Sequence, residues 1–486
     1  MADGGGASGS SPTMPITPRS EIACGMAGIK QEVDVPLTWS GAPPQWLVGD
    51  YVHNGPGRFT AGGRQVSHVF DGLGMLNRIR FAAGGATYRN RFLRGRSWQH
   101  AEQGRPDRGF SFDPPRSLLT KLSILVTKDP EVTDNCLVNT VEYAGRQVAL
   151  TETAWHLAYD DELNTTGHFR FSDDLWPGMT PAHPVRDPAS GEYLNVVFKL
   201  KPPNGYQVWS LAPGTDRRRL VAMVPVRHPS YLHAIAATPT RIVIPAWPLV
   251  GTPLHFALRD RPFIHNFRWE PQRGTLFHVV DRASGAIRTV QGPPWFAFHP
   301  VNAFDRGGEI VLDCCVYRDP SIIKHLSLSR MISGNGLPAG QLRRFVLDAQ
   351  HDRFDEEAIP GLACEFPRLD ERAMMRSHRL LYAIGEAPAD RTPLPCRLRK
   401  LDLISGQVRD WQQSGAYPNE PIFVPRPGGS AEDDGVVLSI VLDAQRRRSF
   451  LLILDAARWT ECARADLPHA LPLLFHGRFS PPGPPR

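Results

Sequence analysis

The stretch HVVDRASGAIRTV, residues 278–290, contains two runs rich in apolar and β-branched residues, separated by a short polar turn. Asp281 can cap such a turn through its carboxylate, and Gly285 can adopt the left-handed backbone conformation that the returning chain needs. The pattern therefore predicts a β-hairpin. One hairpin alone is compatible with any antiparallel fold.

Related stretches recur along the chain: AYDDELNTTGHF (158–169), PVRDPASGEYLNVVF (184–198), RKLDLISGQVRDW (399–411) and, in weaker form, LILDAARWTECARADL (452–467). The recurrence predicts antiparallel sheets of similar build stacked against one another. It favours an all-β fold of the β-propeller type, with a sandwich or a barrel as alternatives. Because the spacing is irregular, insertions are expected between the sheets. The 43 glycines and 46 prolines among 486 residues agree with many short strands.

The composition restricts the class of protein further. Apolar residues make up 41% of the chain, which allows a large core and argues against global disorder. The seven cysteines form no CxxC pair, so a disulfide framework or a structural zinc site is not expected. No apolar stretch is long enough to predict a membrane span. The net charge of +6 is not gathered into a basic stripe with interleaved aromatic residues, so no nucleic-acid partner is expected.

The first 20 residues, MADGGGASGSSPTMPITPRS, are rich in Gly, Ser and Pro. This composition predicts a disordered N-terminal segment ahead of a single propeller domain at residues 21–486. The segment lacks the apolar core of a secretory signal, so a cytoplasmic location is expected. It is also nearly free of acidic residues, which leaves a transit peptide, and with it a plastid location, as an alternative.

Four of the 17 histidines share one setting, because each lies in a loop or at a strand edge before an apolar run: His183, His233, His299 and His476. The separations between them are too long for a local metal motif such as HExxH. In a propeller, however, each sheet can send an inner-strand residue to the axis. Four imidazoles converging there would bind iron, copper, zinc or nickel. From spacing alone, four unrelated core histidines are the simpler interpretation.

Longer stretches resemble the carotenoid cleavage oxygenase family, in chain order from about residue 46 to residue 479. They include LVGDYVHNGPGRF (47–59), PSYLHAIAATPTRIVIPAWPL (229–249), FAFHPVNAFDRGGEIVLDCCVY (296–317), CEFPRLDERAMMRSHRLLYAI (364–384) and LPLLFHGRF (471–479). The resemblance implies a seven-bladed β-propeller with a cap of helices and loops over its axis. It also implies an Fe(II) ion held by the four histidines, and cleavage of a conjugated C=C bond of a carotenoid or apocarotenoid with O₂ to give two carbonyl products.

The resemblance assigns roles to further residues. Three glutamates match those that hold the family's histidines, which pairs Glu152 with His233, Glu365 with His299 and Glu420 with His476. The segment at residues 114–128 matches the family's membrane-dipping apolar patch, so peripheral membrane association is expected through Leu118, Leu119, Leu122 and Leu125. His53 stands where the family usually has Arg.

The resemblance leaves several functions open. VTDNCLVN (132–139) resembles the animal carotene-cleaving and retinoid-isomerising branch. FRWEPQRGTLFHVVDRASGAI (267–287) and DPSIIKHLSLSRMIS (319–333) resemble the plant branch that converts a 9-cis apocarotenal to carlactone. The alternatives to double-bond cleavage are an isomerohydrolase on the same iron site, a stilbene-cleaving oxygenase and a non-catalytic propeller scaffold. The sequence assigns neither substrate-binding residues nor an oligomeric state.

Overall fold

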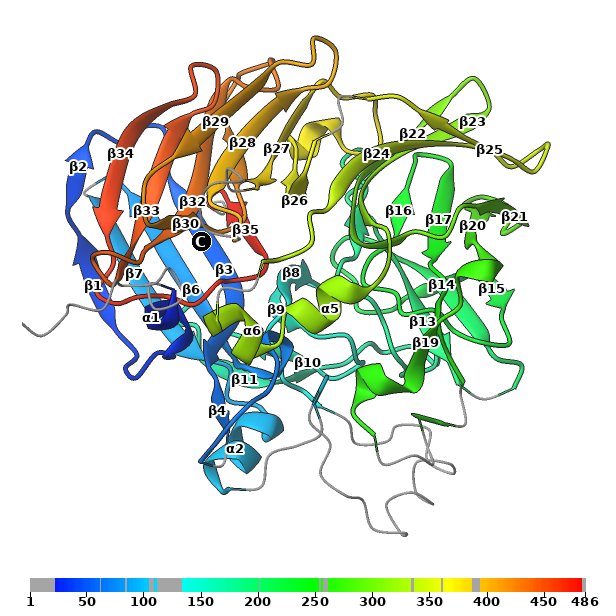
Figure 1. The fold of residues 1–486 in the computed structure, drawn as a ribbon, viewed down its shortest axis with the longest axis horizontal. Coiled ribbons are helices and arrows are strands. Elements are labelled where there is room, and N and C mark those ends of the chain that lie inside the picture. The colour runs from blue at the N-terminus through cyan, green and yellow to red at the C-terminus, as the bar shows by residue number, and fades with distance from the viewer. Residues whose placement is uncertain are drawn as a thin grey trace, which may run out of the picture.

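Seven antiparallel sheets of four to six strands form a ring in the part of the chain that the structure describes (Figure 1). The structure is a computed structural model, and it describes residues 22–61, 63–83, 85–104, 109–111, 133–200, 202–252, 255–256, 261–333, 336–359, 362–386 and 394–482. The ring confirms the predicted seven-bladed β-propeller and rules out the sandwich and the barrel.

Two of the sheets combine strands from both ends of the chain. One has the strand order β1 (Asp34–Leu37), β7 (Gly85–Phe92), β6 (Leu73–Ala82), β3 (Gly49–Arg58) and β35 (Gly477–Ser480). The other has the order β2 (Trp39–Gly41), β34 (Thr460–Asp466), β33 (Arg448–Asp455), β32 (Gly435–Asp443) and β30 (Ala416–Pro418), and β31 (Ile422–Pro425) also pairs with β32. The β3–β35 and β2–β34 pairings therefore close the ring.

The other five sheets follow one another along the chain. The first consists of β8 (Asn139–Tyr143), β9 (Arg146–Leu150), β10 (His156–Tyr159) and β11 (Thr165–Phe169), and the second of β12 (Val185–Arg186), β13 (Tyr193–Lys199), β14 (Gly205–Leu211) and β15 (Arg219–Pro225). The third consists of β16 (Ala236–Ala237), β17 (Arg241–Ala246), β20 (Thr275–Asp281) and β21 (Ile287–Gly292), and the fourth of β22 (Phe296–Arg306), β23 (Glu309–Tyr317), β24 (Gln341–Asp348) and β25 (Arg353–Glu357). The fifth consists of β26 (Cys364–Arg368), β27 (Leu380–Gly385), β28 (Arg397–Asp402) and β29 (Val408–Gln412). Two small ribbons, β4 (Thr60–Ala61) with β5 (Arg64–Gln65) and β18 (Leu249–Gly251) with β19 (Phe267–Trp269), lie outside these sheets.

The repeated hairpin has the chemistry that its sequence predicts. Between β20 and β21, Asp281 Oδ1 accepts a hydrogen bond of 2.7 Å from the backbone N–H of Ser284, and Gly285 has a φ of 72°. Between β28 and β29, Asp402 Oδ1 accepts from the following backbone in the same way, and Gly406 has a φ of 71°. Because only glycine adopts this conformation without steric cost, the Ser-Gly pair ends each turn where the second strand begins.

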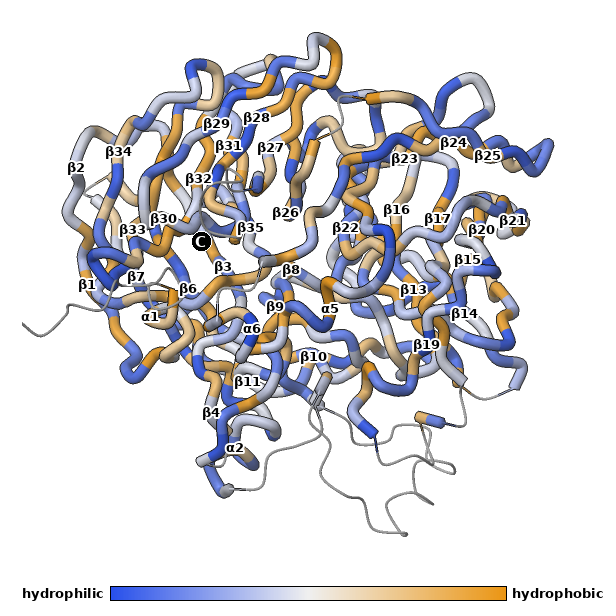
Figure 2. The backbone as a smooth tube through the Cα atoms, viewed as in Figure 1, coloured by the Kyte–Doolittle hydropathy of each residue, from blue (hydrophilic) through white to orange (hydrophobic). Residues whose placement is uncertain are grey.

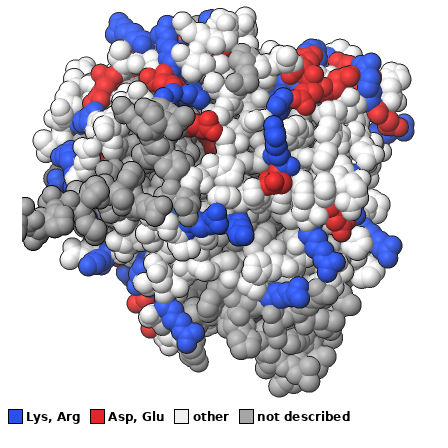
Figure 3. All heavy atoms as spheres, in the orientation of Figure 1, with Lys and Arg blue, Asp and Glu red and all other residues white. Residues whose placement is uncertain are grey.

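Middle strands of the sheets are buried on both faces, because each sheet packs between two neighbours. All nine residues of β32 are buried, whereas the outermost strand β29 is largely exposed. The tip of the β24–β25 hairpin, which projects at the rim, is hydrophilic (Figure 2). Basic and acidic side chains are interspersed among the described residues on the face shown in Figure 3.

Short helical segments cover one end of the ring. They are α1 (Ala23–Met26), η2 (Val69–Asp71), α2 (Arg96–Glu102), α5 (Ser321–His325) and α6 (Leu328–Ser333), with further 3₁₀ turns η3 (Phe263–Asn266) and η4 (Pro271–Arg273). Another 3₁₀ turn, η5 (Glu371–Ala373), lies elsewhere, between β26 and β27. Backbone hydrogen bonds join η2 to the α5–α6 segment, from Val69 N–H to the carbonyl of Leu326 and from Leu328 N–H to that of Ser67. None of the helices among the described residues is long and apolar enough to cross a membrane.

Two of the regions singled out from the sequence lie outside the described residues. One is the N-terminal segment at residues 1–20. The other is the whole segment at residues 114–128, including Leu118, Leu119, Leu122 and Leu125.

Candidate metal centre

The four histidines singled out from the sequence lie in, or just before, an edge strand of four different sheets. His183 and His233 lie just before β12 and β16, His299 lies within β22, and His476 directly precedes β35. In a propeller the innermost strand of each sheet lines the axis, so residues far apart in the sequence meet there.

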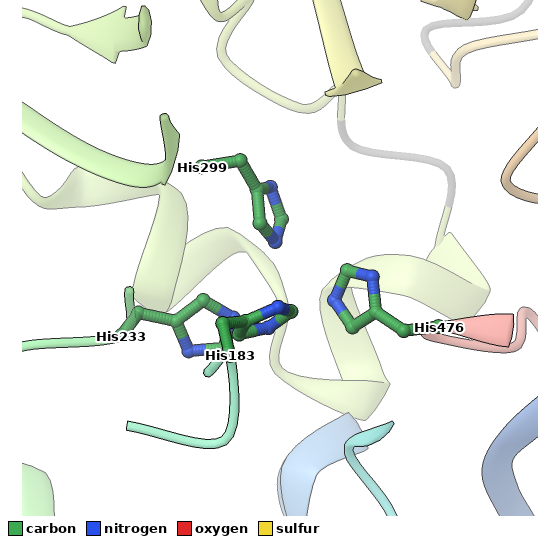
Figure 4. A group of neighbouring side chains, drawn as sticks. All are labelled: His183, His233, His299 and His476. Atoms are coloured by element: carbon green, nitrogen blue, oxygen red, sulfur yellow. The ribbon is translucent and has the colours of Figure 1, made fainter. Parts of the chain in front are cut away.

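The four imidazoles point toward one another (Figure 4), and one ring nitrogen of each lies within 4.8 Å of the others. The Nε2 atoms of His183 and His233 are 3.1 Å apart. Two neighbouring nitrogen ligands with metal–nitrogen bonds of about 2.1 Å would be separated by about 3.0 Å, so this spacing fits a shared ion. The Nε2 of His299 is buried with no hydrogen-bond partner among the described residues, which is costly unless a ligand occupies the site. The donor set therefore fits a metal ion.

Three of the imidazoles are held by carboxylates. The Nδ1 of His233 lies 2.6 Å from Glu152 Oε1, the Nδ1 of His299 lies 2.6 Å from Glu365 Oε2, and the Nδ1 of His476 lies 2.8 Å from Glu420 Oε1. An ionised carboxylate accepts hydrogen bonds only, so each Nδ1 carries the proton and each Nε2 presents its lone pair to the centre. These are the three pairs that the family resemblance implied.

Three further residues hold the carboxylates and were not identified from the sequence. The Tyr231 hydroxyl donates to Glu152 at 3.2 Å, and the Tyr317 hydroxyl donates to Glu365 at 2.8 Å. The Arg368 guanidinium donates two hydrogen bonds to Glu420, at 2.8 and 3.0 Å. Tyr231 and Arg368 lie two and three residues from His233 and Glu365 in the sequence, and this proximity was the only available signal.

The electrostatics of the site keep His183 and His476 neutral and Glu420 ionised. Burial lowers the pKa of His183 well below its ordinary value, and the neighbouring His476 and His233 lower it further. Burial also lowers the pKa of His476 to about 3, although Glu420 opposes this shift. Burial alone would raise the pKa of Glu420, but Arg368 and His476 hold it well below its ordinary value. Neutral imidazoles are the form that binds a metal ion.

Aromatic side chains surround the imidazoles. Phe70, in the cap segment η2, stacks on His233 with ring centroids 6.5 Å apart, and Phe298 lies 5.1 Å from the same ring. Phe366 lies 5.3 Å from both His299 and His476. These rings make the surroundings apolar, and they limit the access of water.

Comparisons with known proteins identify the family of this seven-bladed propeller with four histidines on its axis. The family model described as retinal pigment epithelial membrane protein matches residues 26–481. The chain is 33% identical to carotenoid cleavage dioxygenase 8 homolog A, chloroplastic, of Oryza sativa subsp. japonica, over 93% of this chain and 85% of that protein. It is 28% identical to the mitochondrial carotenoid-cleaving dioxygenase of Macaca fascicularis, over 90% of each chain.

The fold comparison agrees with the sequence comparison. A variant of Synechocystis apocarotenoid oxygenase superposes with a TM-score of 0.84 at 25% identity, covering 96% of this chain and 99% of that chain. The chain therefore belongs to the carotenoid cleavage oxygenase family.

Proposed function

We propose that this chain is an iron(II)-dependent dioxygenase that cleaves one conjugated C=C bond of a carotenoid or apocarotenoid with O₂ to give two carbonyl products. The observation that carries this proposal is the set of four imidazole nitrogens, from four sheets, within 4.8 Å of one another. The relatives named carotenoid cleavage dioxygenase and apocarotenoid oxygenase support the reaction and the substrate class.

Iron is favoured over zinc among the ions that imidazoles bind. Zinc has no redox chemistry, whereas a reaction with O₂ requires an ion that changes its oxidation state. When bound, ferrous iron supplies the electron that lets O₂ react with a closed-shell polyene. His183, His233, His299 and His476 would hold the ion.

The other residues of the site prepare it for an apolar substrate. Glu152, Glu365 and Glu420 fix the orientation of three of the imidazoles. The rings of Phe298 and Phe366 exclude water beside them and offer the apolar contacts that a polyene needs.

Metal content tests the proposal. Wild-type protein prepared without oxygen is expected to hold about one iron per chain, and His299→Ala is expected to lose it, because that change removes a ligand nitrogen. His351→Ala is the matched control, since the His351 side chain is 75% exposed and lies away from the site. Wild-type protein that takes up no iron would contradict the proposal and bring the scaffold function forward.

Oxygen labelling distinguishes cleavage from isomerisation. With ¹⁸O₂ and a carotenoid substrate, cleavage places labelled oxygen in both carbonyl products. A product without label would identify the isomerohydrolase reaction. The chain is 33% identical to the rice enzyme and 28% identical to the macaque enzyme. This difference supports the resemblance of residues 267–287 and 319–333 to the plant branch of the family.

We also propose peripheral membrane association through residues 114–128, because a long polyene partitions into membranes. Removing residues 118–126 is expected to lower binding to liposomes while the rest of the chain stays folded. Unchanged binding would contradict this proposal.

We propose a plastid location for the protein, because the rice relative is named chloroplastic. Imaging a fluorescent C-terminal fusion in plant cells tests this location.

A further inference from the structure

The three carboxylates that hold the histidines differ in the charge of their outer partners. Glu152 and Glu365 accept hydrogen bonds from the neutral hydroxyls of Tyr231 and Tyr317. Glu420 instead receives the guanidinium of Arg368, a permanent positive charge.

Arg368 contacts both the carboxylate and the backbone next to a histidine. Its Nε donates to Glu420 Oε1 at 2.8 Å, and this same oxygen accepts from His476 Nδ1 at 2.8 Å. Its Nη2 donates to Glu420 Oε2 at 3.0 Å and to the carbonyl of Gly477 at 2.8 Å. One carboxylate oxygen therefore separates the cation from the imidazole of His476.

The other side of Glu420 supplies no second cation. His53 Nε2 lies 3.7 Å from Glu420 Oε2, and neither ring nitrogen of His53 has a hydrogen-bond partner among the described residues. Burial lowers the pKa of His53, although Glu420 opposes this shift, so the ring is neutral. Arg368 is thus the cation that compensates Glu420.

The charges of the site balance only with a divalent ion. Three ionised carboxylates and one guanidinium leave two negative charges, which Fe²⁺ neutralises. Fe³⁺ would leave one positive charge in excess, in surroundings of low polarity where such a charge is costly. A positive charge fixed beside Glu420 therefore favours the ferrous form over the ferric form.

We propose that Arg368 is a positioning residue that keeps the metal centre in its divalent state. It does so by holding a positive charge against the carboxylate that orients His476. This inference rests on the iron site of the proposed function. The charge of Arg368, rather than its packing alone, is the property that matters.

The rate at which iron-loaded protein is oxidised in air tests this inference. We expect Arg368→Gln, which removes the charge, to form the ferric electron paramagnetic resonance signal about tenfold faster than wild type, allowing for screening of the 27% exposed Arg368 side chain. Arg368→Lys keeps the charge and should stay within about threefold of wild type.

Arg344→Gln is the matched control. Arg344 forms the same two-pronged contact with Asp313, at 2.7 and 2.8 Å, but Asp313 holds none of the four histidines. The iron in the Arg344→Gln protein should be oxidised at the wild-type rate. Glu420→Gln removes a negative charge, so it should be oxidised more slowly than wild type, which tests the opposite sign if Arg368→Gln does not fold.

The possible failures differ from one another. A wild-type chain that takes up no iron would refute the proposed function and this inference together. Iron-loaded wild type with Arg368→Gln oxidised at the same rate would refute the inference alone. Faster oxidation of Glu420→Gln than of wild type would also refute the inference alone. The same holds if Arg344→Gln speeds oxidation as much as Arg368→Gln does.

Discussion

Glu365 Oε2 lies 2.6 Å from His299 Nδ1, and this contact joins two neighbouring sheets of the propeller. His299 belongs to β22 and Glu365 to β26, the first strands of their sheets. The contact that orients a candidate metal ligand is therefore also a contact between blades. The orientation of His299 thus depends on how these two sheets pack together.

Replacing the Glu365 carboxylate with an amide should separate its role in orienting His299 from its role in joining the two sheets. In Glu365→Gln the side chain keeps its shape but loses its charge, so we expect iron affinity to fall by about 10- to 100-fold while the fold is kept. Competition with a chelator under anaerobic conditions measures this. Glu357→Gln is the control, because Glu357 pairs with Arg306 at the exposed β25. Equal affinities in the two variants would contradict the role of Glu365.

Gly477 allows β35 to approach β3 closely. A Cβ at this position would lie 2.1 Å from His53 Cδ2 and 2.7 Å from the carbonyl oxygen of Val52. Since the backbone cannot give way cheaply, we expect Gly477→Ala to cost about 2 kcal/mol or more in the free energy of unfolding and to lower iron content by displacing His476. Thermal unfolding and metal analysis measure both effects. Ser480→Ala, in the same strand, should be neutral, and a Gly477→Ala protein as stable as wild type would contradict the prediction.

Phe366 has a left-handed backbone, with a φ of 50°, which is unusual for a bulky residue. Its N–H donates to Glu365 Oε2 at 2.9 Å, so the strained backbone helps to hold the carboxylate. Glycine adopts this conformation freely, whereas alanine does not. We therefore expect Phe366→Ala to be less stable than Phe366→Gly by about 1 kcal/mol, measured from urea-unfolding midpoints. The reverse order would show that the backbone relaxes on substitution.

Buried histidines away from the centre make the fold sensitive to acid. Burial lowers the pKa of His68 and His278 to about 4 and that of His156 to about 3. In the unfolded chain these rings take up a proton near pH 6.5, so below that pH the unfolded state binds more protons and stability falls. We expect each to cost about 1 kcal/mol per pH unit between pH 6 and pH 5.

Urea-unfolding midpoints at pH 7 and pH 5 check this acid sensitivity. His278→Gln should show a smaller loss of stability than wild type, because it removes one of the titrating rings. A midpoint that stays constant or rises at pH 5 would contradict the prediction.

The sequence by itself determined the local structure and the candidate ligands. The Asp281–Gly285 turn is specified by residues close together in the chain, because a carboxylate cap and a left-handed glycine act over a few bonds. The four histidines share a setting that the sequence itself shows, but their role as ligands, and the three glutamates, came only from stretches that resemble a family. Their spacing alone did not distinguish a metal centre from unrelated core histidines.

Only the tertiary structure showed what surrounds those residues. The contact of Arg368 with Glu420, the contact of Tyr317 with Glu365 and the left-handed backbone of Phe366 arise where different sheets meet around the axis. Such contacts depend on how the ring closes, through the pairing of β3 with β35. Ring closure is a property of the packing of the whole chain, and no short stretch of sequence encodes it.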